Sequence, residues 1–323
     1  MRMVVTGGAG FIGSAYVRNV LSGHYTGFEP DELVVLDKFT YAGNRANLAP
    51  VAGDERLRIV VGDICDPEVV ERELTGTDLV VHFAAESHVD RSIAGSAEFV
   101  RTNVLGTQTL LQAALEREVG KFVHVSTDEV YGSIDEGSWP EDHPIAPNSP
   151  YSASKASSDL LVRAFFSTHG LDASITRCSN NYGPYQYPEK VIPLFVTNLV
   201  DGLQVPLYGD GLNVRDWLHV DDHCRGIQLV AETGRAGEVY NIGGGTELTN
   251  RELTERLLEI TGRDHTAIRP VEDRKGHDRR YSVDITKIAT ELGYAPRVGI
   301  DTGLRDTVDW YKNNRDWWEP LKG

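Results

Sequence analysis

The sequence predicts an α/β protein in which a doubly wound parallel sheet is combined with a smaller C-terminal domain. In the first half, short β-branched runs alternate with amphipathic stretches, and the runs are apolar on both sides, as in a parallel sheet covered on both faces. After about Asn180 this rhythm changes, and tyrosine, proline and glycine are concentrated in NNYGPYQYPEKVIP. The expected strands span residues 3–6, 33–37, 57–63, 79–85 and 121–127.

Capping residues predict where several helices begin and end. Asp66 followed by Pro67 has the pattern of an N-cap and a first-turn proline. A helix is expected from Ser149-Pro150 to a glycine stop at Gly170, and another from the capping box Thr249 to Glu252. Residues 220–233 are expected to form one more helix of the first domain.

This rhythm also predicts the domain boundaries. We expect residues 1–178 to form the first domain and residues 213–242 to return to it. The second domain is then discontinuous and consists mainly of residues 179–212 and 243–323.

Composition and charge restrict the class of protein. The 323 residues carry 48 acidic and 32 basic side chains, a formal net charge of −16, which disfavours nucleic acid and anionic membranes as partners. Apolar stretches stop well short of the roughly 20 residues that span a bilayer, and the first residues lead straight into a strand pattern, so a soluble, cytoplasmic protein is expected. The three cysteines lack CxxC spacing, which suggests neither a disulfide framework nor a metal site.

A glycine-rich turn, TGGAGFIG, lies between the first strand and the first helix. Gly7, Gly10 and Gly13 allow the backbone to approach a pyrophosphate at the helix N-terminus, as in a Rossmann dinucleotide-binding domain. Asp37 follows at the end of the second strand, where a carboxylate binds ribose hydroxyls and repels a 2′-phosphate, so NAD is favoured over NADP. Adjacent Lys38 makes the exclusion of NADP less firm. Asp63 could reach the adenine amine or close a turn.

Tyr151 and Lys155 lie four residues apart on an expected helix and therefore share one face. A nearby ammonium favours phenolate over phenol, which makes the tyrosine a usable base. Together with the glycine turn, this YxxxK pair resembles the extended short-chain dehydrogenase/reductase family. The resemblance implies a serine or threonine partner after the fifth strand, where Ser126 and Thr127 stand.

Two adjacent acids, Asp128 and Glu129, follow the same strand. STDEVYG, AAESHVDRS, RCSNNYGPYQYPEKVIPL, LYGDGLNVRDWLHVDDHC and GHDRRY together resemble the dTDP-glucose 4,6-dehydratases over residues 3 to about 310. Sugar-nucleotide 4-epimerases usually lack the Asp-Glu pair, and GDP-mannose 4,6-dehydratases carry serine in place of the aspartate. A UDP-sugar 4-epimerase, another nucleotide-sugar enzyme and a non-catalytic dinucleotide-binding protein stay open as alternatives.

The resemblance implies a reaction and a set of residues. Tyr151, aided by Lys155 and Thr127, would oxidise C4 with NAD; Glu129 would remove the C5 proton and Asp128 would protonate the departing C6 hydroxyl. Implied cofactor-binding residues are Gly7, Gly10, Phe11, Ile12, Gly13, Asp37, Lys38, Thr40, Asp63, Ile64, Phe83, Ala84, Ala85, Thr102, Ser126, Tyr151, Lys155 and Asn181. Implied nucleotide-sugar ligands are Ser87, Thr127, Asn180, Glu189, Lys190, Val191, Pro206, Tyr208, Arg215, Asn250, Arg274, His277 and Tyr281.

Three further expectations come from the same resemblance. Where the family often has Arg-Pro-Gly, this chain has Arg274-Lys275-Gly276, which leaves the geometry of that loop open. The short segment 133–149 resembles compact actinobacterial enzymes of deoxysugar and antibiotic biosynthesis. A homodimer is implied, with the expected helices over 97–117 and 150–169 as its interface.

Overall fold

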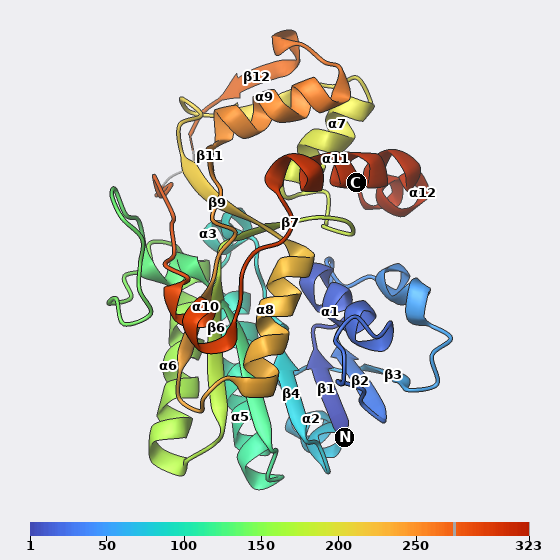
Figure 1. Ribbon diagram of the computed structural model, residues 1–323, viewed down its shortest axis with the longest axis vertical. Helices are drawn as coiled ribbons and strands as arrows, with labels where there is room; N and C mark the ends of the chain where they lie inside the picture. Colours follow the sequence, from blue (N-terminus) through green and yellow to red (C-terminus); the bar gives the residue numbers. More distant parts are fainter. Residues whose placement is uncertain (274–275, 323) are drawn as a thin grey trace.

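The computed structural model describes residues 1–273 and 276–322, and its largest element is a seven-stranded parallel sheet with helices on both faces (Figure 1). The strand order is β10-β6-β5-β4-β1-β2-β3, which confirms the predicted doubly wound α/β class. The strands are β1 (Arg2–Thr6), β2 (Glu32–Asp37), β3 (Leu57–Val61), β4 (Leu79–His82), β5 (Lys121–Thr127), β6 (Ala173–Cys178) and β10 (Val239–Ile242).

Each face of the sheet has its own hydrophobic core. Met3 and Val5 of β1 pack into one core, while Val4 between them packs into the other, as the alternation of side chains along a strand requires. The first core is covered by α1 (Phe11–Leu21), α8 (Val220–Thr233) and α10 (Thr286–Leu292). The second is covered by α2 (Pro67–Leu74), α5 (Thr107–Glu116) and α6 (Pro150–His169).

The predicted helix boundaries are confirmed by the capping contacts. Asp66 accepts hydrogen bonds from the N–H groups at the start of α2, and Ser149 forms a capping box with Ser152 at the start of α6. Helix α6 ends at Gly170, whose φ of 71° is left-handed, a region that glycine occupies without strain. The capping box of Thr249 and Glu252 starts α9 (Asn250–Thr261).

Two strands end earlier than the sequence predicts. Strand β3 stops at Val61 rather than at residue 63, because the Asp63 carboxylate accepts the N–H of Cys65 and closes a turn. Strand β4 stops at His82 rather than at residue 85, and the backbone of Ala84 then lies against Gly7. Both corrections come from turns that bring the chain to the carboxyl edge of the sheet.

The expected helix over 97–117 is continuous but not uniform. It consists of α4 (Ala97–Phe99), a π-helical segment η2 (Val100–Gly106) and α5. Within η2, the side chain of Asn103 accepts the N–H of Glu86 and donates to the hydroxyl of Ser154. The π-helical turns therefore occur where the helix is tied both to α6 and to the loop after β4.

The remaining elements lie mainly at the top of Figure 1, around a separate core that contains Trp217, Tyr311 and Trp318. Helix α10, although late in the chain, packs against β10 and α8 at the main sheet. Whether the domain boundaries fall at 178, 212 and 242 stays a prediction. The other strands are β7 (Asn180–Tyr182), β8 (Val205–Tyr208), β9 (Val214–His219), β11 (Glu247–Thr249) and β12 (Ile268–Val271). The other helical segments are η1 (Arg45–Val51), α3 (Val89–Ala94), η3 (Asp128–Tyr131), α7 (Val191–Val200), η4 (His265–Ala267), α11 (Ile300–Asn313), α12 (Arg315–Trp318) and η5 (Glu319–Leu321).

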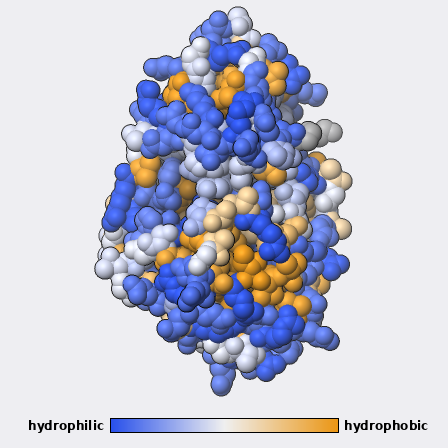
Figure 2. Space-filling view, turned by 90° about the vertical axis from the view of Figure 1, so that its right-hand side faces the viewer, coloured by the Kyte–Doolittle hydropathy of each residue, from blue (hydrophilic) through white to orange (hydrophobic). Residues whose placement is uncertain are grey.

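The surface combines a charged exterior with one open sheet edge. Figure 2 shows hydrophobic side chains gathered in the lower half of the side that carries β3. Val61 of this edge strand is 60% exposed. Across residues 1–273 and 276–322, no helix is both long enough and apolar enough to cross a bilayer.

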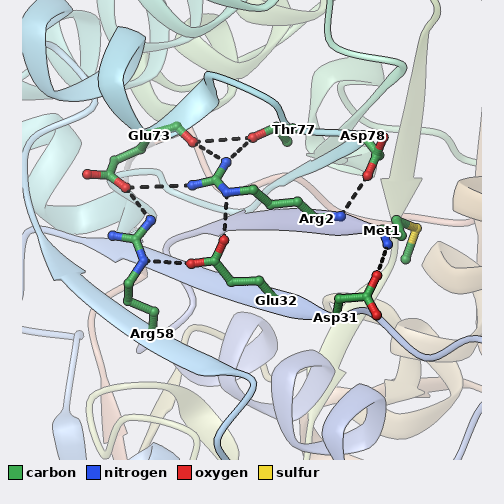
Figure 3. Close-up of polar contacts among 8 residues, drawn as sticks. All are labelled: Met1, Arg2, Asp31, Glu32, Arg58, Glu73, Thr77 and Asp78. Atoms are coloured by element: carbon green, nitrogen blue, oxygen red, sulfur yellow. Dashed lines mark hydrogen bonds and ion pairs between the residues drawn. The ribbon is translucent and has the colours of Figure 1, made fainter.

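Charged side chains join the amino end of the sheet to α2 (Figure 3). Glu73, which is 3% exposed, accepts Arg58 Nη2 at 2.7 Å and Arg72 Nε at 2.9 Å, and Arg2 Nη2 lies 3.8 Å away. Arg2 also donates to Glu32 at 2.8 Å and to the backbone carbonyl of Glu73. One nearly buried carboxylate therefore holds guanidinium groups from β1, β3 and α2 together.

We expect Glu73→Ala to lower the free energy of unfolding by about 2 kcal/mol. This loss lies between the losses typical of breaking an exposed ion pair and a buried one. Burial alone would raise the pKa of Glu73, but the guanidiniums of Arg58 and Arg72 outweigh it, so the pKa is lowered. A carboxyl with a lowered pKa stabilises the fold above its unfolded pKa of about 4.3, and this contribution disappears as the pH falls through the folded pKa.

Urea unfolding of both proteins between pH 7 and about pH 2 measures this difference, which should shrink as the pH falls below the unfolded pKa of about 4.3. The control is Glu71→Ala, which is also in α2 and removes the exposed ion pair between Glu71 and Arg117. It should lower the free energy of unfolding by no more than about 0.5 kcal/mol. An equal loss in the two variants would contradict the role given to Glu73.

Candidate active site

The carboxyl end of β1 turns into α1 through a backbone that is closely packed on two sides. A Cβ on Gly7, whose φ is 68°, would lie 2.6 Å from the backbone nitrogen of Ala84. A Cβ on Gly13 would lie 2.3 Å from the carbonyl oxygen of Gly7. The turn therefore requires glycine at both positions, and it presents the positive N-terminal end of α1 to the space above the sheet.

Asp37, at the carboxyl end of β2, is held rigidly beside this turn. Its two carboxylate oxygens accept the backbone N–H groups of Ala9 at 2.9 Å and Phe39 at 2.8 Å. Burial raises the pKa of Asp37, and the two N–H groups counteract this effect. The carboxylate is thereby fixed toward the cavity described next.

The first cavity runs along the carboxyl edge of the sheet from Asp37 to Lys155. Every residue that the sequence associates with a dinucleotide lines this cavity. The cavity has further lining residues to which the sequence analysis assigned no role, although some of them lie within the quoted motifs: Leu36, Ala42, Gly43, Gly62, Glu86, Glu98, Val125, Cys178, Ser179, Gln186 and Tyr187.

The second cavity lies between the loop after β4 and the upper elements. It contains all the described residues expected to bind a nucleotide sugar, except Thr127, which lines the first cavity. Arg274 lies outside the described residues. Lining residues that the sequence reasoning missed are His88, Val89, Asp90, Ser149, Leu194, Phe195, Leu207, Trp217, Gly276 and Asp278.

The two cavities meet at a shared wall. Ser87, Glu129, Asn180, Glu189 and Lys190 line both of them. A ligand in the first cavity and a ligand in the second would therefore approach each other beside the carboxylate of Glu129.

Tyr151 and Lys155 point into the first cavity from one face of α6, as predicted. The Lys155 ammonium donates to the carbonyl of Val125 at 2.8 Å, and burial lowers the pKa of Lys155 to about 8. Burial, reinforced by Glu129, raises the pKa of Tyr151 well above its ordinary value, and a hydrogen bond with Thr127 counteracts part of this rise. Burial therefore favours the phenol form of Tyr151, and the role of Tyr151 as a base stays a prediction.

Beneath this pair lies a layer of buried polar groups. Asp159 pairs with Arg177 at 2.9 Å and with His124 at 3.4 Å. Burial lowers the pKa of His124 to about 4, so this imidazole is neutral. Burial alone would raise the pKa of Asp159, but Arg177 and His124 lower it to about 2. The layer therefore supports Lys155 from below with one fixed ion pair.

Asp128 and Glu129 form the first turn of η3, directly after β5. Asp128 is 2% exposed, and burial raises the pKa of its carboxyl far above the ordinary range, with a further rise from the neighbouring Glu129. Burial therefore favours the protonated form of the Asp128 carboxyl, and the neighbouring Glu129 lies at the shared wall. The two adjacent carboxyl groups both line the first cavity.

The second cavity offers positive charge and flat surfaces. Arg215, which is 7% exposed, lies 4.1 Å over the ring of Tyr281 and donates to the carbonyl of Asp278 at 2.9 Å. Lys190 donates to the carbonyl of Ser87 at 2.9 Å. These two cations suit an anionic ligand in an otherwise acidic protein.

The residues present fit a dinucleotide and a second polar ligand. Gly7, Gly10 and Gly13 of the glycine turn line the first cavity, and α1 begins at this turn. Asp128 Oδ2 and Asn180 Oδ1 are buried at the cavity walls, and neither has a hydrogen-bond partner among residues 1–273 and 276–322. Buried polar atoms of this kind normally pair with a ligand or with water.

Comparison with known proteins identifies the family. A family model described as GDP-mannose 4,6 dehydratase matches residues 4–307. A dTDP-glucose 4,6-dehydratase from Streptomyces niveus is 62% identical over 322 residues, which cover 100% of this chain and 96% of the relative. The chain belongs to the dTDP-glucose 4,6-dehydratase family. The crystal structure of a member from Streptomyces venezuelae, DesIV with NAD bound, has a TM-score of 0.99 and 66% identity, with both chains covered completely.

The fold alone does not separate this family from its neighbours. A UDP-glucose 4-epimerase from Thermotoga maritima matches with a TM-score of 0.88 and 34% identity, over 98% of this chain and 100% of the epimerase. In the sequence, the Asp128-Glu129 pair is the feature that favours the dehydratases over the 4-epimerases; both acids line the first cavity, and Glu129 also lines the second.

We expect Asp128 to hold its proton in the ligand-free protein at pH 7, because burial and the adjacent carboxyl of Glu129 disfavour the carboxylate. An infrared difference spectrum between the native protein and Asp128→Asn should contain the carbonyl stretch of a protonated carboxyl, and this band should persist as the pH is lowered. Asp135→Asn, in the exposed loop that follows, is the control and should lack the band at pH 7. A purely carboxylate difference spectrum for Asp128 would contradict the assignment.

Proposed function

We propose that this protein is a dTDP-glucose 4,6-dehydratase that uses NAD and forms dTDP-4-keto-6-deoxyglucose. The observation that carries the proposal is the position of Asp128 and Glu129: both line the first cavity together with Tyr151, and Glu129 also borders the second cavity. An oxidising site and an eliminating site thus coincide in space. The family membership and the NAD bound to DesIV support the same reaction.

The first half-reaction oxidises C4 of the glucose. Tyr151 takes the proton of the C4 hydroxyl, and Thr127 holds this hydroxyl in place. Lys155 provides the positive charge that a developing phenolate needs, since burial has already raised the pKa of Tyr151. Bound NAD supplies a hydride acceptor and later a hydride donor.

The second half-reaction removes water between C5 and C6. The C5 proton becomes acidic only when C4 is a ketone, so elimination has to follow oxidation. Glu129 removes this proton, and Asp128 donates its own proton to the departing C6 hydroxyl. The opposite protonation states of two adjacent carboxyls allow this division of roles.

The nucleotide part of the substrate belongs in the second cavity. Lys190 and Arg215 face the diphosphate, and the ring of Tyr281 is held beside Arg215. The other proposed contacts are Ser87, Asn180, Glu189, Val191, Pro206, Tyr208, Asn250 and His277. Thymidine is chosen over other bases because of the family to which the chain belongs.

Changing Glu129 to Gln should separate the two half-reactions. Oxidation depends on Tyr151 and Lys155, so addition of dTDP-glucose should still produce bound NADH, which then accumulates because elimination is blocked. Tyr151→Phe should prevent NADH from forming at all. Single-turnover absorbance of the cofactor and product mass measure both outcomes.

Glu136→Gln, an exposed acid in the same loop, is the matched control and should dehydrate the substrate at the native rate. A Glu129→Gln variant that dehydrates at a similar rate would remove Glu129 from the mechanism. Inversion at C4 without loss of water would instead favour a 4-epimerase, the alternative that the likeness to the Thermotoga maritima enzyme keeps open. Binding of nucleotide sugars without turnover would favour a dinucleotide-binding protein.

We also propose a homodimer formed by the α4-η2-α5 segment and by α6. Large hydrophobic side chains are exposed there: Val100 (54%) and Leu105 (51%) on η2, and Leu160 (53%) on α6. Burying such residues against a second copy would remove apolar surface from water. The pathway that best suits the compact chain is deoxysugar or antibiotic biosynthesis, in the cytoplasm.

Sedimentation equilibrium at working concentration should give twice the chain mass of 35.7 kDa. Leu160→Asp should shift the protein toward the monomer, because it places a charge in the interface. Leu203→Asp, at a side chain that is also 53% exposed but lies in the turn after α7, should leave the mass unchanged. A monomeric native protein would contradict the proposed dimer.

A further inference from the structure

One end of the first cavity holds an unusual set of charges. Asp37, Lys38, Asp63 and Glu98 all line this end. Arg101 reaches it from η2, one residue before the lining residue Thr102. Three carboxylates therefore surround two cations, and the formal balance at this end is one negative charge.

Asp63 holds both cations. Its Oδ2 lies 2.9 Å from the ammonium of Lys38 and 3.6 Å from the guanidinium of Arg101. Its Oδ1 accepts the N–H of Cys65 at 2.9 Å, so the side chain is fixed by the turn after β3. Glu98 contributes a longer contact to Lys38, at 3.9 Å.

The protonation states agree with this geometry. The hydrogen bond from Lys38 to Asp63 raises the pKa of Lys38. Burial raises the pKa of Asp63, but the N–H of Cys65 and the ammonium of Lys38 outweigh burial, and the net pKa is lowered. Both partners are charged at neutral pH.

We infer that Asp63 is a specificity-determining residue, which excludes NADP by keeping Lys38 and Arg101 from a 2′-phosphate. A 2′-phosphate is recognised by basic side chains next to the ribose. Asp37 repels this phosphate directly, and Asp63 removes the cations that would compensate for the repulsion. From the sequence alone, Lys38 weakens the exclusion of NADP because it lies next to Asp37. Its pairing with Asp63 makes Lys38 unavailable to a 2′-phosphate.

This inference rests on the proposed use of a nicotinamide dinucleotide. It predicts how far the replacement of Asp37 alone changes the preference for NAD over NADP. Asp37→Ala removes the repulsion but leaves both cations paired, so the preference for NAD should narrow without reversing. Adding Asp63→Asn keeps the size of the side chain and its bond to Cys65, but releases Lys38 and Arg101. The ratio of NADP to NAD affinity should then rise about tenfold further, a change of the size that one charge-assisted contact provides.

Calorimetric titration of the nucleotide-free variants with NADP and with NAD measures this ratio. The gain should fall as the salt concentration is raised, because the released cations are partly exposed. Adding Lys38→Gln and Arg101→Gln should return the ratio of NADP to NAD affinity to its value in Asp37→Ala. Glu68→Gln, which removes an exposed charge from the neighbouring helix α2, is the control for net charge and should leave the ratio unchanged.

Two results would overturn the inference. The ratio could stay the same when Asp63→Asn is added to Asp37→Ala, or the gain could survive the loss of both Lys38 and Arg101. In the second case another cation, such as Arg45 over the ring of Phe39, would be the phosphate ligand. A native protein that binds neither dinucleotide would instead refute the proposed function, and thermal unfolding of each variant separates loss of binding from loss of fold.

Discussion

The alignment of strand ends in the seven-stranded sheet is the constraint on which the site depends. Thr6 is in register with both Leu36 and His82, and His82 is in register with His124, so β1, β2 and β4 reach their carboxyl ends within one residue of each other, and β5 continues to Thr127. Residues that lie far apart in the chain then follow one edge. The glycine turn, Asp37 and the Asp128-Glu129 pair meet there because the strands are parallel and in this order.

Local chemistry allowed much of the fold to be predicted. Asp66, Ser149 and Thr249 act on the N–H groups two or three residues away, so their capping roles can be read from a few letters of sequence. The turn that ends β3 is equally local, since Asp63 accepts the N–H of Cys65, and the sequence allowed this turn as one of two roles for Asp63. The end of β4 could not be predicted in this way, because Ala84 there lies against Gly7, which comes from a separate part of the chain.

The same distinction applies to the site. The glycine turn, the YxxxK pair and the acid pair have local patterns, and their placement in one cavity follows from the topology. Gln186 and Tyr187 lie within the quoted stretch RCSNNYGPYQYPEKVIPL, but only the folded chain shows that they line the cavity. The raised pKa of Tyr151 was also not predicted, since it results mainly from burial in the folded chain. Lys38 and Arg101 both pair with Asp63. This pairing could not be predicted from the sequence, because it depends on how β2, the turn after β3 and η2 lie relative to one another.

The shared wall at Glu129 has a consequence for the hydrogen atoms of the product. In the proposed reaction a carboxyl that has taken up the C5 proton must return a proton to C5 when hydride arrives at C6. Glu129 borders both cavities, so ligands bound in the two cavities would lie beside its carboxyl group. After turnover in deuterated water, the deuterium content at C5 of the product would report how often solvent exchanges with the occupied site. A chemical property of the stable product would thus measure a motion of the protein.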